Sequence, residues 1–131
     1  MLAVKLWNAL PVLEELSRVS FGYETAKQIM TWVKLARTEK EKAQAAFDEL
    51  TKRYEAEDLG EGRLRFTSEE NRRAFAADWD PVENKTVTEL PEKIDLRSEL
   101  KGMRISAAAL EALEEMIITE GAGDGTAEDE V

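Results

Sequence analysis

The chain has 131 residues, with 28 acidic and 18 basic side chains, a net charge of −10, and neither cysteine nor histidine. This composition excludes disulfides, thiolate or imidazole metal sites, and Ser-His or Cys-His catalysis. The acidic balance argues against a general affinity for nucleic acid or anionic membranes. Because 43% of the residues are hydrophobic, the chain is expected to build one small core and to remain soluble.

The last twelve residues differ from the rest in composition. They hold five of the ten surplus negative charges, include three glycines, and have no large apolar side chain before Val131. Such a stretch buries too little apolar surface to offset the entropy lost on ordering. We therefore expect a single helical domain over residues 1–118 and a disordered acidic tail over residues 119–131. The sequence shows no recognisable targeting signal and no apolar run of membrane length, which favours a cytoplasmic location.

A first helix is predicted over residues 9–19. Asn8 is suited to the N-cap, and Pro11 falls in the first turn, where a missing N–H is harmless. The spacing places apolar residues on one face of this helix: Val12, Leu13, Leu16 and Val19. Gly22 then provides a tight turn into the next helix.

A long helix is predicted over residues 24–57, because this stretch contains neither glycine nor proline. At 1.5 Å per residue it would extend about 50 Å. Its apolar positions alternate between spacings of three and four, which is typical of a helix packed nearly parallel to another. The stripe, interrupted only by Lys40, consists of Ala26, Ile29, Val33, Ala36, Lys40, Ala43, Phe47, Leu50 and Tyr54.

The second half of this stripe raises the main functional question, because the first helix is too short to cover it. One alternative is that helices beginning near Thr67 and Ser106 fold back onto it within the same chain. The other is that a second copy or a different protein docks there. Trp7 lies outside the clearly predicted helices and is a further candidate anchor. The predicted partner-binding residues are Ala43, Phe47, Leu50, Tyr54 and Trp7.

The remaining segments predict short elements. Residues 63–66 alternate as in a half-buried strand, and extended segments at 86–91 and 93–96 are candidate pairing partners. Thr67 and Glu70 have the spacing of a capping box, predicting a helix through about Asp78 that ends before Pro81. A last helix is predicted to begin after Ser106, with an apolar face and a closing glycine: Leu110, Leu113, Ile117 and Gly121.

Two clusters of residues are weak candidates for a functional site. Asp78, Asp80 and Glu83 followed by Lys85 superficially resemble a Mg²⁺-dependent nuclease site, but such spacings arise by chance in a chain this acidic. Four arginines interleaved with Phe66 and Phe75 suggest nucleic-acid contacts, although ion pairing with nearby glutamates is the more economical interpretation: Arg63, Arg65, Arg72 and Arg73. We therefore assign no catalytic, cofactor-binding or metal-ligating residue and expect no enzyme.

Three stretches carry a family resemblance: residues 5–16 (KLWNALPVLEEL), the sequence Thr25-Ala26-Lys27 opening the long helix, and residues 94–96 followed by 100–106 and 110–113. They resemble a family of small uncharacterised helical proteins of tailed bacteriophages and prophages. The segment between the long helix and Ile94 departs from that pattern. The resemblance implies a phage or prophage origin, a cytoplasmic location in the host cell, and a structural or host-directed role.

The expected fold is mainly α: a short and a long helix forming a hairpin or coiled coil, a small two-stranded or extended element, and a C-terminal helix packed on the long helix. The expected function is non-enzymatic protein–protein binding through the long helix, in self-assembly as a homo-oligomer or in assembly of phage components. The alternative is an acidic inhibitor of a host defence nuclease or other nucleic-acid-binding protein, of the anti-CRISPR or anti-restriction type. A metal-dependent nuclease is a distant third hypothesis.

Overall fold

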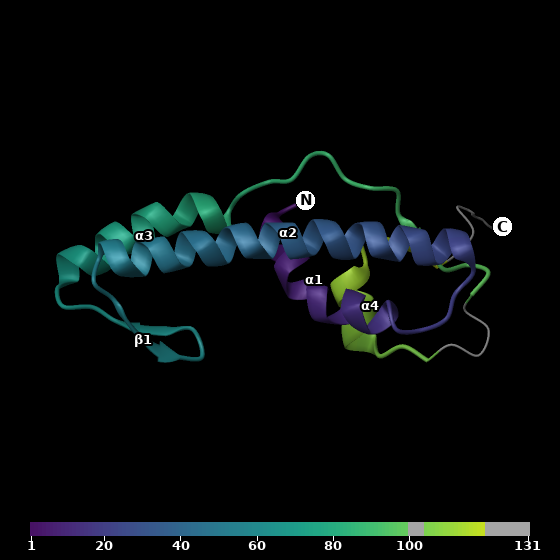
Figure 1. The fold of residues 1–131 in the computed structure, drawn as a ribbon, viewed down its shortest axis with the longest axis horizontal. Helices are drawn as coiled ribbons and strands as arrows, with labels where there is room; N and C mark the ends of the chain where they lie inside the picture. The colour runs from purple at the N-terminus through teal and green to yellow at the C-terminus, as the bar shows by residue number, and fades with distance from the viewer. Residues whose placement is uncertain (100–103, 120–131) are drawn as a thin grey trace. The chain divides into compact units, whose positions relative to one another are not determined.

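The computed structural model describes residues 1–99 and 104–119. In these ranges the chain forms four helices and two small sheets of two strands each (Figure 1). The predicted class is confirmed, with a short helix, a long helix, a two-stranded element and a C-terminal helix packed on the long one. In chain order the elements are α1 (Ala3–Leu16), α2 (Tyr23–Arg53), β1 (Glu57–Gly60), β2 (Arg63–Arg65), α3 (Glu69–Glu83), β3 (Ile94–Asp95), α4 (Ala107–Leu113) and β4 (Ile117–Ile118).

Internal contacts group the residues into two compact units, and both α1 and α2 contribute residues to each. The Trp7 unit comprises Met1–Trp7 and Arg37–Thr88, and the Trp32 unit comprises Asn8–Ala36 and the chain from Glu89 onward. Neither unit is a continuous segment, and the single domain over 1–118 stays a prediction. Of the tail predicted over 119–131, all but Thr119 lies outside the described residues.

The Trp32 unit contains most of the fully buried apolar side chains. They come from three sources, the second half of α1, the first half of α2, and the segments around β3 and β4. Burial of so many aliphatic groups, each stabilising the fold by roughly 1.5–3 kcal/mol, makes this the larger of the two cores. The members below 2% exposure are Ala9, Leu13, Ile29, Trp32, Ala36, Ile94, Leu96, Leu113 and Met116.

The segment leading into β3 is fixed to α2 by hydrogen bonds from side chains. The Trp32 indole N–H donates to the Glu92 carbonyl at 2.7 Å, and the Thr25 hydroxyl donates to the Asp95 carbonyl at 3.1 Å. β3 then pairs in parallel with β4, where the Ile94 amide donates to the Met116 carbonyl at 2.7 Å. These bonds satisfy buried backbone groups that a two-residue strand would otherwise leave unpaired.

The Trp7 unit is built around the second half of α2 and α3. Aromatic rings pack between these helices, with Phe47 edge-on to Phe75 and to Trp79 at centroid distances of 6.0 and 5.7 Å. Phe66, just after β2, adds a third ring against Phe75 at 5.3 Å. Such tilted and edge-to-face pairs are favourable beyond the area they bury.

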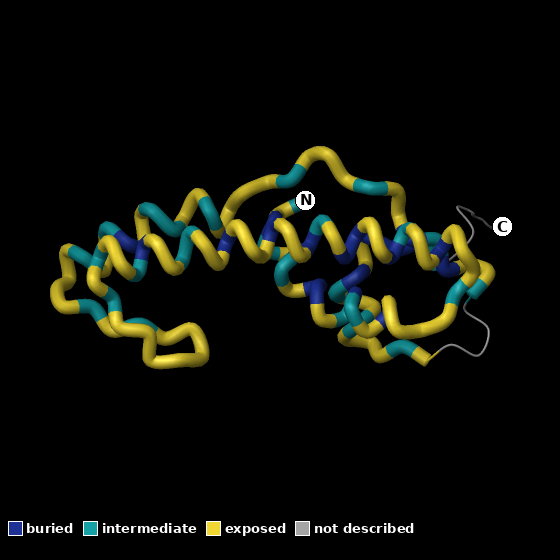
Figure 2. The backbone as a smooth tube through the Cα atoms, viewed as in Figure 1, coloured by how far each residue is buried: buried dark blue, intermediate teal, exposed yellow. Residues whose placement is uncertain are grey.

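The stripe predicted along α2 is largely confirmed. Figure 2 shows buried positions recurring along this helix, and Ile29, Val33, Ala36, Ala43 and Leu50 are among them. The prediction is wrong at its first position, since Ala26 is exposed and its neighbour Thr25 is buried, because Thr25 hydrogen-bonds to the chain near β3. At the polar interruption, Lys40 is exposed and Glu39 takes the buried position.

The bounds predicted for the first helix are wrong. α1 begins at Ala3, so Asn8 lies mid-helix and Pro11 lies inside the helix rather than in its first turn. The apolar spacing extends upstream through Ala3 and Leu6, both fully buried, and this packing outweighs the hydrogen bond that Pro11 cannot donate. Val19, predicted on the buried face, follows the helix end and is 49% exposed.

The predicted strand at residues 63–66 exists, but its expected partner is wrong. β2 pairs with β1 in an antiparallel hairpin rather than with the segments at 86–96. The turn requires positive φ at Gly60, Glu61 and Gly62, with values of 85°, 55° and 77°. Two glycines tolerate this left-handed backbone at no steric cost, which favours the local hairpin over a long-range pairing.

The last two helices also differ from prediction. The N-cap of α3 is Ser68, which accepts from the Asn71 amide at 3.0 Å, and not Thr67 as predicted. The helix also continues through Pro81 to Glu83. Ser106 caps α4 as predicted. Leu110 is 39% exposed, Ile117 lies in β4 rather than in the helix, and the closing glycine predicted at 121 lies outside the described residues.

Candidate partner-binding pocket

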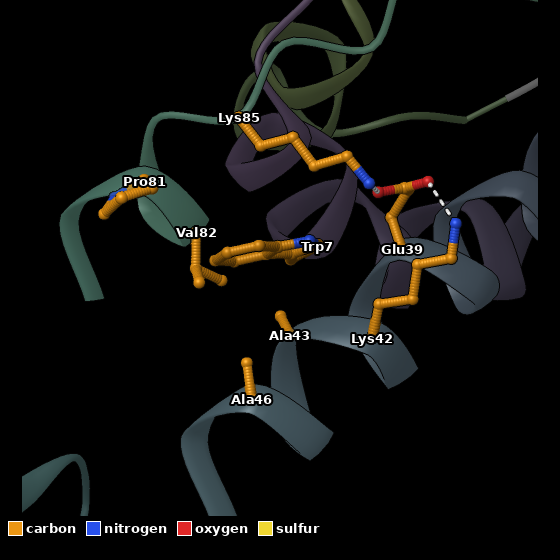
Figure 3. Close-up of a pocket in the computed structure, with 8 residues that line it drawn as sticks. All are labelled: Trp7, Glu39, Lys42, Ala43, Ala46, Pro81, Val82 and Lys85. Carbon is orange, nitrogen blue, oxygen red and sulfur yellow. Dashed lines mark hydrogen bonds and ion pairs between the residues drawn. The ribbon is translucent and has the colours of Figure 1, made fainter. Parts of the chain in front are cut away.

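A pocket of about 240 Å³ opens in the Trp7 unit between α1, α2 and α3 (Figure 3). Its walls combine apolar groups with one cluster of charges. Figure 3 shows the Trp7 ring beside Val82, with the methyl groups of Ala43 and Ala46 facing the same space. The lining residues are Trp7, Glu39, Lys42, Ala43, Ala46, Pro81, Val82 and Lys85.

The N-terminal segment is held in place by backbone hydrogen bonds to the chain that follows α3. The Ala3 amide donates to the Lys85 carbonyl at 2.8 Å, and the Val87 amide donates to the Met1 carbonyl at 2.7 Å. An antiparallel bridge joins Leu2 to Thr86 between them. The bridge at Leu2 leads directly into α1, which begins at Ala3. It therefore determines where Trp7, on the same helix, lies.

The pocket exists because two positions of α2 that face it carry small side chains. Ala43 and Ala46 are spaced i, i+3 and therefore lie on the same face of the helix. Each contributes only a methyl group to the wall that faces the Trp7 ring (Figure 3). The space between these methyl groups, the Trp7 ring and Val82 is the pocket.

Glu39 gives the pocket its charged side. Its side chain is only 7% exposed and accepts a hydrogen bond from the Lys85 ammonium at 2.8 Å, while the Lys42 ammonium lies at 3.6 Å. The side chains of Lys85 and Lys42 are 44% and 62% exposed, so both lysines remain in contact with solvent. A buried carboxylate requires such partners, because burying it unpaired costs several kcal/mol.

Trp7 carries an unsatisfied donor. Its indole nitrogen is buried and has no hydrogen-bond partner among the described residues. A buried polar group without a partner costs about 1–3 kcal/mol. The ring itself packs against Trp79 at a centroid distance of 6.2 Å and an interplanar angle of 44°.

The predicted partner-binding residues fall into two groups. Trp7 and Ala43 both line the pocket, although they come from different helices. Phe47, Leu50 and Tyr54 instead take part in packing within the Trp7 unit. Phe47 contacts the rings of α3, and Leu50 is only 6% exposed. The contacts of Phe47 and Tyr54 with α3 are those of the intramolecular alternative, and partner binding at these three positions stays a prediction.

Tyr54 is tied to α3 by a polar cluster. Its hydroxyl donates to the Asp78 carboxylate at 2.5 Å, and Arg53 reaches the same oxygen at 3.4 Å. This hydrogen bond to a carboxylate raises the pKa of the Tyr54 hydroxyl above its usual value of 10.0, because the bond holds the proton on the phenol oxygen. The cluster links the C-terminal end of α2 to α3.

The acids considered for metal-dependent cleavage do not form a cluster. Asp78 is engaged by Tyr54, Asp80 accepts from Asn84 at 3.0 Å, and Lys85 pairs with Glu39. Across residues 1–99 and 104–119, no group of three acidic residues is placed to hold a metal ion.

Three of the four arginines near the hairpin form ion pairs. Arg65 pairs with Glu57, and both Arg72 and Arg73 pair with Glu69. The pairing with Arg72, as the main cause, lowers the pKa of the Glu69 carboxyl. These contacts agree with the structural interpretation of the arginine cluster.

Sequence analysis missed most of the pocket. The sequence does not single out Glu39, because positions 39 and 40 continue the α2 spacing equally well and no local signal distinguishes them. Val82 and Lys85 follow a proline that suggested a helix end. Ala43 is among the predicted partner-binding residues, whereas Ala46 lies outside the predicted stripe.

No protein-family model, curated protein or solved structure matches this chain. None of the helices in the described ranges has the length and apolar character needed to cross a bilayer.

Proposed function

We propose that this chain is a non-enzymatic binding protein of phage or prophage origin, and that the Trp7 pocket receives an apolar side chain of a protein partner. The observation that carries the proposal is the pocket itself, formed by a tryptophan face and two alanine methyl groups on α2. Aromatic anchors in small desolvated pockets commonly dominate protein–protein affinity. The partner is a second copy of the chain, another phage component or a host protein.

The size of the pocket supports a single side chain rather than a cofactor. Its volume of about 240 Å³ is below the roughly 300–1,000 Å³ typical of sites for drug-sized ligands. It exceeds the roughly 150 Å³ of an engineered apolar cavity that binds benzene. One leucine or phenylalanine side chain therefore matches the space.

The test is affinity capture from extract of infected and uninfected host cells, using three forms of the chain. Ala46→Leu fills the pocket from its α2 wall, whereas Ala45→Leu adds the same group at an exposed neighbouring position outside the lining. We expect wild type and Ala45→Leu to retain the same protein and Ala46→Leu to lose it. Equal capture by all three folded forms would reject the pocket as the binding site.

The acidic-inhibitor alternative makes a different prediction in the same experiment. Outside the last twelve residues the surplus of acids is small: the Trp7 unit has eleven basic and thirteen acidic residues. An inhibitor acting through net charge would bind a basic protein, lose it steeply as salt is raised, and retain it in Ala46→Leu. That pattern would favour the alternative over the pocket.

A further inference from the structure

We infer that the segment docking in the Trp7 pocket is acidic: an apolar side chain directly flanked by aspartate or glutamate in an extended or helical peptide. This inference rests on the proposed function and specifies the partner chemistry at the same site. It is argued from the charges at the rim of the pocket.

The rim carries a net positive charge although the chain as a whole is strongly negative. Three of the lining residues are ionisable, and two of them are lysines that share a single carboxylate, Glu39. Among the residues that line the pocket, the charge is therefore +1, against −10 for the entire chain.

The accessibility of the charges determines which of them a partner meets. Glu39 is 7% exposed, so an incoming group does not reach its carboxylate freely, whereas the side chains of Lys42 and Lys85 are 62% and 44% exposed. A partner approaching the pocket therefore meets two partly exposed lysine side chains, and little of the carboxylate that pairs with them at 2.8 and 3.6 Å. Figure 3 shows both lysine chains extending along the Glu39 side, away from the alanine wall.

The two parts of the site select two adjacent features of one segment. The alanine and tryptophan walls favour an apolar side chain, and the lysine rim favours a carboxylate at its side. Lysine is a flexible point charge with three donors and can hold one carboxylate while it meets a second. An uncharged neighbouring residue in the partner would gain no ion pair with these lysines. A lysine or arginine there would be repelled by them.

The experiment uses four end-blocked peptides as probes. They are Gly-Asp-Leu-Glu-Gly, its neutral form Gly-Ser-Leu-Ser-Gly, its basic form Gly-Lys-Leu-Lys-Gly, and the acidic form without the apolar side chain, Gly-Asp-Ala-Glu-Gly. Binding to the ¹⁵N-labelled full chain is followed by the indole N–H cross-peaks of the three tryptophans. Trp7→Phe identifies the Trp7 signal, and Trp32 serves as the internal reference.

We expect the acidic leucine peptide to shift the Trp7 cross-peak and to bind up to about fivefold more tightly than the neutral one, the range of a single exposed ion pair. The basic peptide should bind more weakly than both. The difference between acidic and neutral peptides should shrink as salt is raised. Ala46→Leu should abolish the Trp7 shift for every peptide.

Matched lysine variants test the rim. Lys42→Gln should remove most of the preference for the acidic peptide, measured as the ratio of the dissociation constants of the neutral and acidic peptides. Lys40→Gln removes the same charge from an exposed α2 position outside the pocket lining and should keep the preference. Equal loss in both variants would mean that net charge, not the rim, sets the preference, and would overturn the inference.

The outcomes separate the inference from the proposed function. If acidic and neutral leucine peptides shift Trp7 with equal affinity, the acidic specificity is wrong and the pocket still accepts an apolar side chain. If the alanine-containing acidic peptide binds as well as the leucine one, the segment is held by charge alone and the inference fails. If no leucine peptide shifts Trp7 at millimolar concentration, both the inference and the proposed function are rejected.

Discussion

At the scale of single residues, the most consequential group is the buried carboxylate of Glu39. It is almost fully covered, whereas the two lysines that pair with it remain largely in contact with solvent. The ion pairs are therefore asymmetric, because the carboxylate is buried and the lysines are not. Removing the carboxylate returns two ammonium groups to water at little cost, but removing its closer lysine leaves a buried negative charge with a single distant partner.

This asymmetry predicts that Lys85→Met is more destabilising than Glu39→Gln. We expect Lys85→Met to lower the free energy of unfolding by about 1–3 kcal/mol, and Glu39→Gln to lower it by less than about 1 kcal/mol. Urea denaturation at pH 7, followed by far-UV circular dichroism, measures both. The opposite order would show that Glu39 contributes more through its contacts than it costs through burial.

Asp95 provides a pH-dependent contribution to stability. Arg97 donates two side-chain hydrogen bonds and one backbone hydrogen bond to its carboxylate, and these lower the pKa of Asp95 from 3.8 to about 2. Since the folded pKa lies below the unfolded one, the stabilisation is present above pH 4 and is lost as the pH falls toward 2.

Asp95→Asn should therefore reduce stability at pH 7 and flatten its decline between pH 4 and pH 2. Both side chains are over a third exposed, so solvent screening limits the loss to about 1 kcal/mol or less. Thermal unfolding at pH 7, 4 and 2 measures it, with the exposed Glu41→Gln as the control. A variant whose pH profile parallels that of wild type would contradict this role for Asp95.

At the scale of the elements, α3 shows how packing overrides a local signal. Pro81 lies inside the helix, where it lacks an N–H and its ring crowds the preceding turn. The helix nevertheless continues, because Trp79 before the proline packs on Trp7 and Phe47, and Val82 after it lines the pocket. The helix thus tolerates a residue that its isolated sequence would not.

Replacing the proline tests this compromise. We expect Pro81→Ala to raise the free energy of unfolding by about 1 kcal/mol or more, since a proline in a helix interior costs about 3 kcal/mol relative to alanine and its constraint on the unfolded chain returns part of that. The midpoint of urea denaturation provides the measurement. Unchanged or lower stability would mean that the proline is well accommodated near the helix end.

At the scale of the whole molecule, stability depends on where the buried apolar surface lies. The Trp32 unit contains Leu13 at 0% exposure, whereas Val19, at a position that the same apolar pattern assigned to the core, is 49% exposed. The two residues therefore distinguish the observed core from the core expected from spacing alone.

Leu13→Ala should cost about 2–5 kcal/mol, because it deletes buried methyl groups and leaves a cavity. Val19→Ala should change stability by less than about 0.5 kcal/mol, as is usual at exposed positions. Urea denaturation monitored by tryptophan fluorescence compares the two variants directly. Similar losses in both would contradict the position of the core described here.

The sequence by itself determined the mainly helical class, the long glycine-free helix, most of its buried stripe, and the N-cap at Ser106. These features depend on neighbouring residues, whose spacing and propensity are sufficient to predict them. Strand pairing, the burial of Glu39 rather than Lys40, and the continuation of α3 through Pro81 depend on residues distant in the chain. The pocket belongs to the same group: Ala43 and Ala46 leave space only because Trp7 and Val82 stand opposite them, and a volume bounded by three separate segments exists only once those segments have packed.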